Sequence, residues 1–184
     1  GCHRGRTFRM ALIEAAYQAL TDMKFRAFDS FEGLTQNDSG SDVGQRWNAG
    51  NLCTSVPEFL SLVHPYCDTS DQIRIYQGFY DRSLSPALVS SLKSEGAKIA
   101  FLCVDCDFFE SAAPVFDFCD NFLQDGAVVY IDDYFAGYRG VPDKGVQAAF
   151  RAFQRSSNWK FQEYLPVGAF GKSFLAYSDR RVSI

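Results

Sequence analysis

The sequence has few histidines and no long apolar segment, and both shortages restrict its possible functions. His3 and His64 are the only histidines among 184 residues, which disfavours a His/Cys zinc centre and a hydrolase with histidine support. No apolar run approaches the roughly 20 residues of a membrane-spanning helix, and no signal peptide is recognisable. We therefore expect a cytoplasmic protein without a membrane partner.

An excess of positive charge is also lacking. The net charge of −4 argues against a nucleic-acid partner, and the six cysteines are too scattered for a disulfide scaffold in a chain of this length. Cys103 and Cys106 have redox spacing, but residues three apart on a strand face opposite ways, so we interpret both as small core or pocket-lining residues. The hydrophobic content of 47% predicts one domain over residues 1–184 with a substantial core.

The chain opens without methionine and without a strand. Gly1 and Gly5 belong to a loop that is followed at once by a helical pattern. In α/β nucleotide-binding domains such a loop follows the first strand and lets a ligand approach the backbone closely. We therefore expect an N-terminally truncated domain whose first strand is missing from the chain.

Helical and strand patterns alternate along the remainder of the sequence. The predicted helices cover residues 8–20, 54–63, 84–92, 111–123 and 146–153, and the predicted strands cover residues 24–28, 73–76, 98–104, 126–131, 160–165 and 173–177. The strands 98–104 and 126–131 have the continuous apolar character of strands buried on both faces. This order predicts the Rossmann-like α/β fold of class I methyltransferases, with a mostly parallel sheet and a C-terminal antiparallel hairpin.

Acidic residues follow two of the predicted buried strands. Asp105 and Asp107 come after the strand 98–104, and Asp132 and Asp133 come after the strand 126–131. Open α/β sheets bind ligands beyond the carboxyl ends of their strands, and carboxylates suit Mg²⁺ or Mn²⁺. The sequence therefore favours a divalent-cation site over acids that merely cap helices or form turns.

Asp107 has two interpretations of about equal weight. It lies two residues beyond Asp105, so on a continuing strand the two side chains face the same side. Asp107 is then a candidate general base or a group that orients a ligand, with Glu110 behind it. The alternative is that Asp107 is the N-cap of the following helix.

The polar segment from Thr35 to Asn51 is too long for a simple connection. We expect it to be a mobile lid that closes over the acceptor. Trp47 within it is expected to pack under the loop.

Four motifs in order resemble the macrocin O-methyltransferase family. They are residues 28–34 (FDSFEGL), 78–84 (GFYDRSL), 104–111 (VDCDFFES) and 131–134 (IDDY). The resemblance implies an S-adenosylmethionine-dependent enzyme that methylates sugar hydroxyls of macrolides, with the metal ligands at Asp105, Asp132 and Asp133. The sequence departs from the family pattern at Cys106 and Phe109, which bears on the acceptor rather than on the reaction.

The cofactor is expected at the ends of the first strands present. Asp29 is placed to accept hydrogen bonds from both ribose hydroxyls, the role of an acid at this position in nucleotide-binding domains. The other expected cofactor contacts are Gly1, Gly5, Ser30, Gly78, Phe79, Tyr80 and Asp81. Candidate aromatic residues of an acceptor pocket are Phe108, Phe109, Tyr134, Phe135 and Tyr138.

The function expected from these features is metal-assisted O-methylation of a sugar or a similar small-molecule natural product, with S-adenosylmethionine as cofactor. Two alternatives remain: a non-catalytic α/β domain of the same fold, and a metal-dependent hydrolase that uses the Asp cluster. The expected partner is the small-molecule acceptor, with a homo-oligomer possible.

Overall fold

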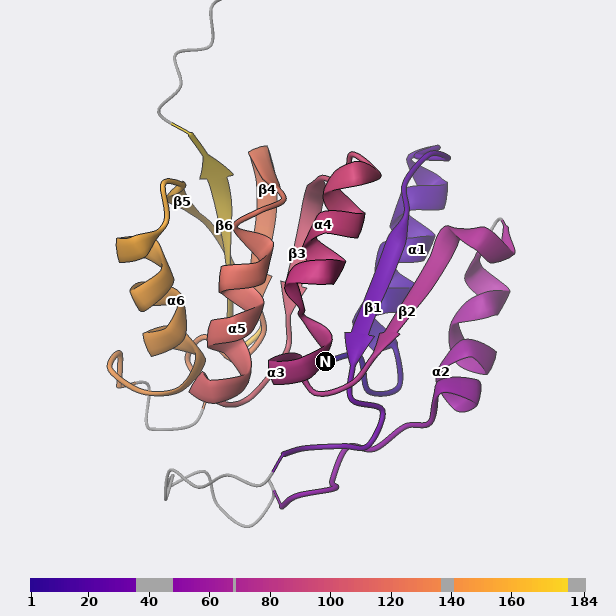
Figure 1. The fold of residues 1–184 in the computed structure, drawn as a ribbon, viewed down its shortest axis with the longest axis horizontal. Helices are drawn as coiled ribbons and strands as arrows, with labels where there is room; N and C mark the ends of the chain where they lie inside the picture. The colour runs from indigo at the N-terminus through magenta and orange to yellow at the C-terminus, as the bar shows by residue number, and fades with distance from the viewer. Residues whose placement is uncertain (36–47, 68, 137–140, 179–184) are drawn as a thin grey trace, which may run out of the picture. The chain divides into compact units, whose positions relative to one another are not determined.

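A computed structural model of the chain describes residues 1–35, 48–67, 69–136 and 141–178 (Figure 1). These residues form two compact units, one up to Ser83 and one from Leu84 onward. Within the described ranges, no helix has the length and apolar character needed to cross a membrane. Most of the predicted lid, including Trp47, and the aromatic Tyr138 lie outside the described residues.

The first unit contains a two-stranded parallel sheet with helices packed on it. Its strands β1 and β2 are paired from Phe25 with Ile73 to Asp29 with Gln77, so their carboxyl ends lie at the same edge. Its elements are α1 (Arg6–Tyr17), β1 (Phe25–Asp29), α2 (Val56–Val63), the 3₁₀ turns His64–Tyr66 and Ser70–Gln72, β2 (Ile73–Gln77) and α3 (Tyr80–Ser83). The core joins buried residues of both helices to the sheet: Leu12, Ala15, Phe25, Ala27, Phe31, Phe59, Val63 and Ile73.

The helix ends of this unit follow local sequence signals. The hydroxyl of Ser55 accepts a hydrogen bond from the backbone N–H of Glu58, which confirms the predicted start of α2. Helix α1 ends at Tyr17 and not at Leu20 as predicted. Ala19 adopts a left-handed conformation with φ 55°, and the N–H of Leu20 bonds to the carbonyl of Ala15, as in helix-terminating motifs.

The second unit is a four-stranded sheet in the order β3–β4–β6–β5. Strands β3 and β4 are parallel, whereas β6 is antiparallel to both β4 and β5. The predicted closing hairpin is therefore confirmed, and its second strand lies between β4 and β5. The elements are α4 (Pro86–Ser94), β3 (Ile99–Val104), α5 (Phe109–Cys119), β4 (Leu123–Ile131), α6 (Gly145–Ser156), β5 (Lys160–Val167) and β6 (Gly171–Tyr177).

Phenylalanines hold the helices of the second unit on its sheet. Helices α5 and α6 lie side by side on one face (Figure 1). The ring of Phe150 on α6 lies 5.3 Å from that of Phe116 on α5 and 4.6 Å from that of Phe174 on β6, measured between centroids. Phe116, Phe150 and Phe174 are fully buried. This aromatic core fixes α6 against the hairpin.

Two predictions about the second unit are wrong. Helix α5 stops at Cys119, because the Asn121 side chain caps it by donating to the carbonyls of Asp117 and Phe118, and β4 begins already at Leu123. Strand β3 is not buried on both faces, since Phe101 is 46% exposed. The strand is an end strand of its sheet among the described residues.

Candidate active site

The carboxyl ends of β3 and β4 bring three carboxylates together. Asp105 directly follows β3, and Asp132 and Asp133 directly follow β4. The parallel pairing ends with Val104 opposite Ile131, and the N–H of Asp132 donates to the carbonyl of Val104 at 3.0 Å. One carboxylate oxygen from each of the three aspartates lies within 4.8 Å of the other two. The structure thus brings together the three acids that the sequence predicted as metal ligands.

Burial and mutual repulsion disfavour the ionised form of two acids at this edge. Burial raises the pKa of Asp133 to about 7, and the charges of Asp107, Asp105 and Asp132 add to the shift. Burial also raises the pKa of Asp107 to about 6, with a further contribution from Asp105. Asp107 is therefore close enough to the three carboxylates to interact with their charges.

The N-cap interpretation of Asp107 is wrong. The N-cap of α5 is Phe108, and no side chain caps this helix end. Glu110, which the sequence places behind Asp107, is exposed in the first turn of α5. Asp107 is thus left beside the acidic cluster without a helix-capping role.

The cluster offers oxygen ligands only. Cys106 lies between two of the acids, but it is buried, and desolvation raises the pKa of its thiol to about 12. A neutral thiol is a poor metal ligand, because metals bind the thiolate. Among the described residues, the cluster consists of Asp105, Asp132 and Asp133 and includes neither histidine. The donor set therefore fits a hard divalent cation better than zinc.

Tyr130 is a neighbour of the cluster that sequence reasoning missed. Its hydroxyl donates a hydrogen bond to Oδ1 of Asp132. The signal was present, because Tyr130 lies two residues before Asp132 and alternate residues of a strand share a face.

In the first unit, the Asp29 carboxylate organises the opening loop. Its Oδ2 accepts from the N–H of Cys2 at 2.5 Å and from the N–H of His3 at 3.2 Å. Its Oδ1 accepts from the N–H of Phe31 at 2.7 Å. Because a carboxylate has about four acceptor positions, Asp29 has room for about one ribose hydroxyl rather than two while the loop stays in place.

Glycine is required near Asp29 at two positions, Gly5 and Gly78, for different structural reasons. Gly5 begins α1 with φ 66°, and a Cβ there would lie 2.8 Å from Cγ1 of Val63. Gly78 has φ 135°, and its N–H donates to the carbonyl of Asp29 at 2.9 Å. The opening loop, Asp29 and Gly78 therefore meet at one sheet edge, where the sequence predicts a cofactor site.

The other predicted cofactor residues have varied surroundings. The hydroxyl of Ser30 donates to the carbonyl of Gly33 and accepts from the N–H of Glu32, so it stabilises a turn. The hydroxyl of Tyr80 donates to the carbonyl of Phe28 at 3.2 Å. Asp81 pairs with its exposed neighbour Arg82 at 3.6 Å. Cofactor contacts by these residues, and by Gly1 and Phe79, remain predictions.

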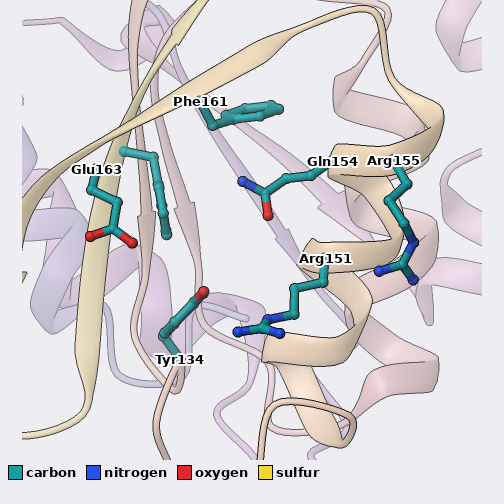
Figure 2. Close-up of a pocket in the computed structure, with 7 residues that line it drawn as sticks. Tyr134, Arg151, Gln154, Arg155, Phe161 and Glu163 are labelled. Atoms are coloured by element: carbon teal, nitrogen blue, oxygen red, sulfur yellow. The ribbon is translucent and has the colours of Figure 1, made fainter.

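A pocket of about 380 Å³ lies between α6 and the β5–β6 hairpin (Figure 2). Tyr134 lines it, whereas Phe108 is buried in the core and Phe109 and Phe135 are exposed. Of the predicted acceptor-pocket aromatics, Tyr134 alone lines this pocket among the described residues. Its remaining lining comes from α6 and the hairpin: Arg151, Gln154, Arg155, Phe161, Glu163 and Phe174.

Lys172 connects this pocket to the end of β4. Its ammonium group pairs with Glu163 at 2.6 Å and lies 5.5 Å from the ring centroid of Tyr134. The backbone of Lys172 is paired with Ile131, the residue before Asp132. Sequence reasoning had no local signal for this lysine, because its partners come from distant parts of the chain.

Comparison with solved structures places the fold among methyltransferases. The O-methyltransferase NovP has a TM-score of 0.70 at 18% identity, over 94% of this chain and 68% of that chain. The calicheamicin methyltransferase CalS11 has a TM-score of 0.75 at 16% identity, over 95% of this chain and 69% of that chain. A comparison with curated proteins found no match. The fold is therefore the Rossmann-like fold of class I methyltransferases, as predicted.

The family model of macrocin O-methyltransferases (TylF) matches residues 1–161. The chain belongs to this macrocin O-methyltransferase family, which confirms the resemblance seen in the four motifs. It is accordingly an S-adenosylmethionine-dependent O-methyltransferase, and the non-catalytic and hydrolase alternatives are not supported.

Proposed function

We propose that the chain methylates a hydroxyl of a sugar or a similar small molecule with the help of a divalent cation bound by Asp105, Asp132 and Asp133. The convergence of the three carboxylates within 4.8 Å carries this proposal. Carboxylates at such separations repel one another. A bound cation would replace this repulsion with coordination.

The separations fit one small ion. Oxygen ligands lie about 2.0–2.1 Å from Mg²⁺, so two ligands on opposite sides of it are about 4.2 Å apart. The carboxylate oxygens of the cluster are within 4.8 Å of one another, and small side-chain rotations would bring them into range. Mg²⁺ or Mn²⁺ is therefore the metal we propose.

Each part of the reaction has candidate residues. S-adenosylmethionine supplies the methyl group as a sulfonium, and a divalent cation, when bound, acts as a Lewis acid and as a template for the acceptor. Asp107 is partly buried beside Asp105 and Asp133, and it does not cap α5. We assign it the role of accepting the proton of the hydroxyl.

The cofactor would be held by the first unit, through Asp29, the loop Gly1–Gly5 and the segment Gly78–Asp81. A sugar-type acceptor is supported by the family match and by the apo structure of CalS11, which is described as a TDP-rhamnose 3′-O-methyltransferase (TM-score 0.62, 14% identity). Which hydroxyl is methylated is a matter for acceptor screening with labelled S-adenosylmethionine.

Binding of Mn²⁺, followed by its electron paramagnetic resonance signal, tests the metal site without requiring an acceptor. Loss of a group that hydrogen-bonds to a metal ligand typically lowers metal affinity about 10–100-fold. Asp105→Asn and Asp133→Asn change the ligands themselves, so each should weaken Mn²⁺ binding by more than this. Asp117→Asn, on the exposed face of α5, is the matched control. Equal Mn²⁺ affinity in all four proteins would exclude the cluster as the metal site.

A further inference from the structure

Two arginines in the pocket between α6 and the hairpin lack partners. Arg151 and Arg155 lie one turn apart on α6, and both line the pocket (Figure 2). Among the described residues, no ion pair or hydrogen bond engages either guanidinium group. Like charges at this spacing on a helix repel each other. Both side chains are exposed, so this repulsion is small, and an anion bound between them and the opposite wall would relieve it.

The opposite wall does not supply that negative charge. Glu163 on β5 faces the pocket, but the ammonium of Lys172 pairs with it at 2.6 Å. Lys172 neutralises Glu163, so the two arginines leave a net charge of two positive charges at the pocket. The chain as a whole has a net charge of −4. This local excess of positive charge indicates an anionic ligand.

The pocket also has an apolar and a neutral polar part. Phe161 and Tyr134 contribute rings, and Gln154 contributes an amide (Figure 2). The volume of about 380 Å³ falls within the about 300–1,000 Å³ typical of small-molecule sites. The lining therefore suits a ligand with a charged end and a flat apolar part.

We propose that this pocket binds a phosphate or carboxylate group attached to a flat apolar moiety. A guanidinium group donates two parallel hydrogen bonds to such an anion, and aromatic side chains pack against flat rings. The assignment depends on two unpaired arginines, a neutralised glutamate and a cavity of sufficient size.

The position of the pocket suggests where the anion comes from. Tyr134 lines the pocket and directly follows Asp133, while Lys172 is backbone-paired with Ile131, which precedes Asp132. The pocket and the acidic cluster thus share the end of β4. This relationship favours the anionic end of the acceptor as occupant, an assignment that rests on the proposed function; a free phosphate ligand is the other source.

Calorimetric titration with phenyl phosphate in EDTA tests the pocket independently of activity. The wild type should bind phenyl phosphate more tightly than inorganic phosphate. The double variant Arg151→Gln/Arg155→Gln should lose about tenfold or more in affinity per guanidinium, the loss expected for a hydrogen bond to a charged group. Lys98→Gln/Lys160→Gln removes two exposed charges elsewhere and should bind as the wild type does.

Equal loss in both double variants, or none in either, would overturn the proposal. Arg151→Lys is a second variant, which keeps the positive charge and loses the planar pair of donors. It should weaken the binding of phenyl phosphate less than the double arginine variant does. Thermal unfolding of each variant checks that the fold is retained.

A charged and an uncharged acceptor of the same sugar then distinguish the two sources of the anion, which are the acceptor itself and a free phosphate ligand. Methyl transfer is measured to a nucleoside-diphosphate sugar and to the methyl glycoside of the same sugar. A preference for the charged acceptor that disappears in the double arginine variant assigns the anion to the acceptor, and retained binding without such preference assigns it to a free phosphate ligand. If neither acceptor is methylated, the acceptor proposal fails, whereas the calorimetric result still decides the pocket.

Discussion

Tyr130 fixes the orientation of Asp132 by donating a hydrogen bond from its hydroxyl to Oδ1. Gly171 on β6 makes this possible, because a Cβ there would lie 2.9 Å from Cε2 of the Tyr130 ring. Burial and the bond to Asp132 raise the pKa of the Tyr130 hydroxyl well above its usual value, so the hydroxyl stays protonated and remains a donor. The carboxylate of Asp132 is thereby held at the edge of the cluster.

Tyr130→Phe should weaken Mn²⁺ binding by about 10–100-fold, the usual effect of removing a group that orients a metal ligand. Binding of S-adenosylhomocysteine should be unchanged, because the residues proposed to hold it belong to the first unit. Tyr164→Phe, at a tyrosine that is 53% exposed, is the matched control. An unaltered Mn²⁺ affinity in Tyr130→Phe would show that the hydrogen bond does not serve a metal ligand.

Asp29→Ala should weaken binding of S-adenosylhomocysteine by roughly 1.5–3 kcal/mol, the range for a lost hydrogen bond to a charged group. Calorimetry gives the affinity. The same substitution removes the acceptor of three backbone N–H groups, those of Cys2, His3 and Phe31. Hydrogen exchange at these amides should therefore become faster.

Asp29→Asn separates the two effects, because it keeps one carbonyl acceptor for the loop. Its exchange rates should lie between those of the wild type and Asp29→Ala. Asp22→Ala, at an exposed acid of the same unit, serves as control. Wild-type affinity in Asp29→Ala would remove Asp29 from the cofactor site.

The stability of the metal-free protein should depend on Asp133. Its folded-state pKa is raised from 3.8 to about 7, so between these values the folded state binds more protons than the unfolded state. The free energy of unfolding therefore falls as the pH rises through this window. Asp133→Asn resembles the protonated acid and should become more stable than the wild type near the upper end of the window.

Urea unfolding in EDTA across the window measures this difference. Asp117→Asn should follow the wild type at every pH. A wild-type protein that gains stability relative to Asp133→Asn as the pH rises would contradict the repulsion argued for the cluster.

The acidic cluster was predictable from sequence because its geometry follows from topology. Parallel strands end at the same edge, so acids after two adjacent strands meet there, as Asp105 and Asp132 do. The pocket was not predictable in this way. Arg151 and Glu163 share it only because the aromatic core around Phe150 fixes α6 on the hairpin, a relationship between distant segments.

The order of elements was also predictable, whereas their ends and burial were less so. The end of α5 depends on the Asn121 side chain, and the apolar run 111–123 does not show that Leu123 belongs to a strand. The exposure of Phe101 on β3 is likewise not revealed by the apolar character of the strand, because burial depends on which elements of the chain pack against it.

The central claim is that methyl transfer depends on a divalent cation at Asp105, Asp132 and Asp133. Its most direct test is transfer of labelled methyl from S-adenosylmethionine to a sugar acceptor after exhaustive chelation, and again after Mg²⁺ is added back. The account predicts that activity is lost on chelation and restored by Mg²⁺ in the wild type, but not in Asp105→Asn or Asp133→Asn. Full activity in the chelated wild type would contradict the metal mechanism and leave proton abstraction by a side chain such as Asp107.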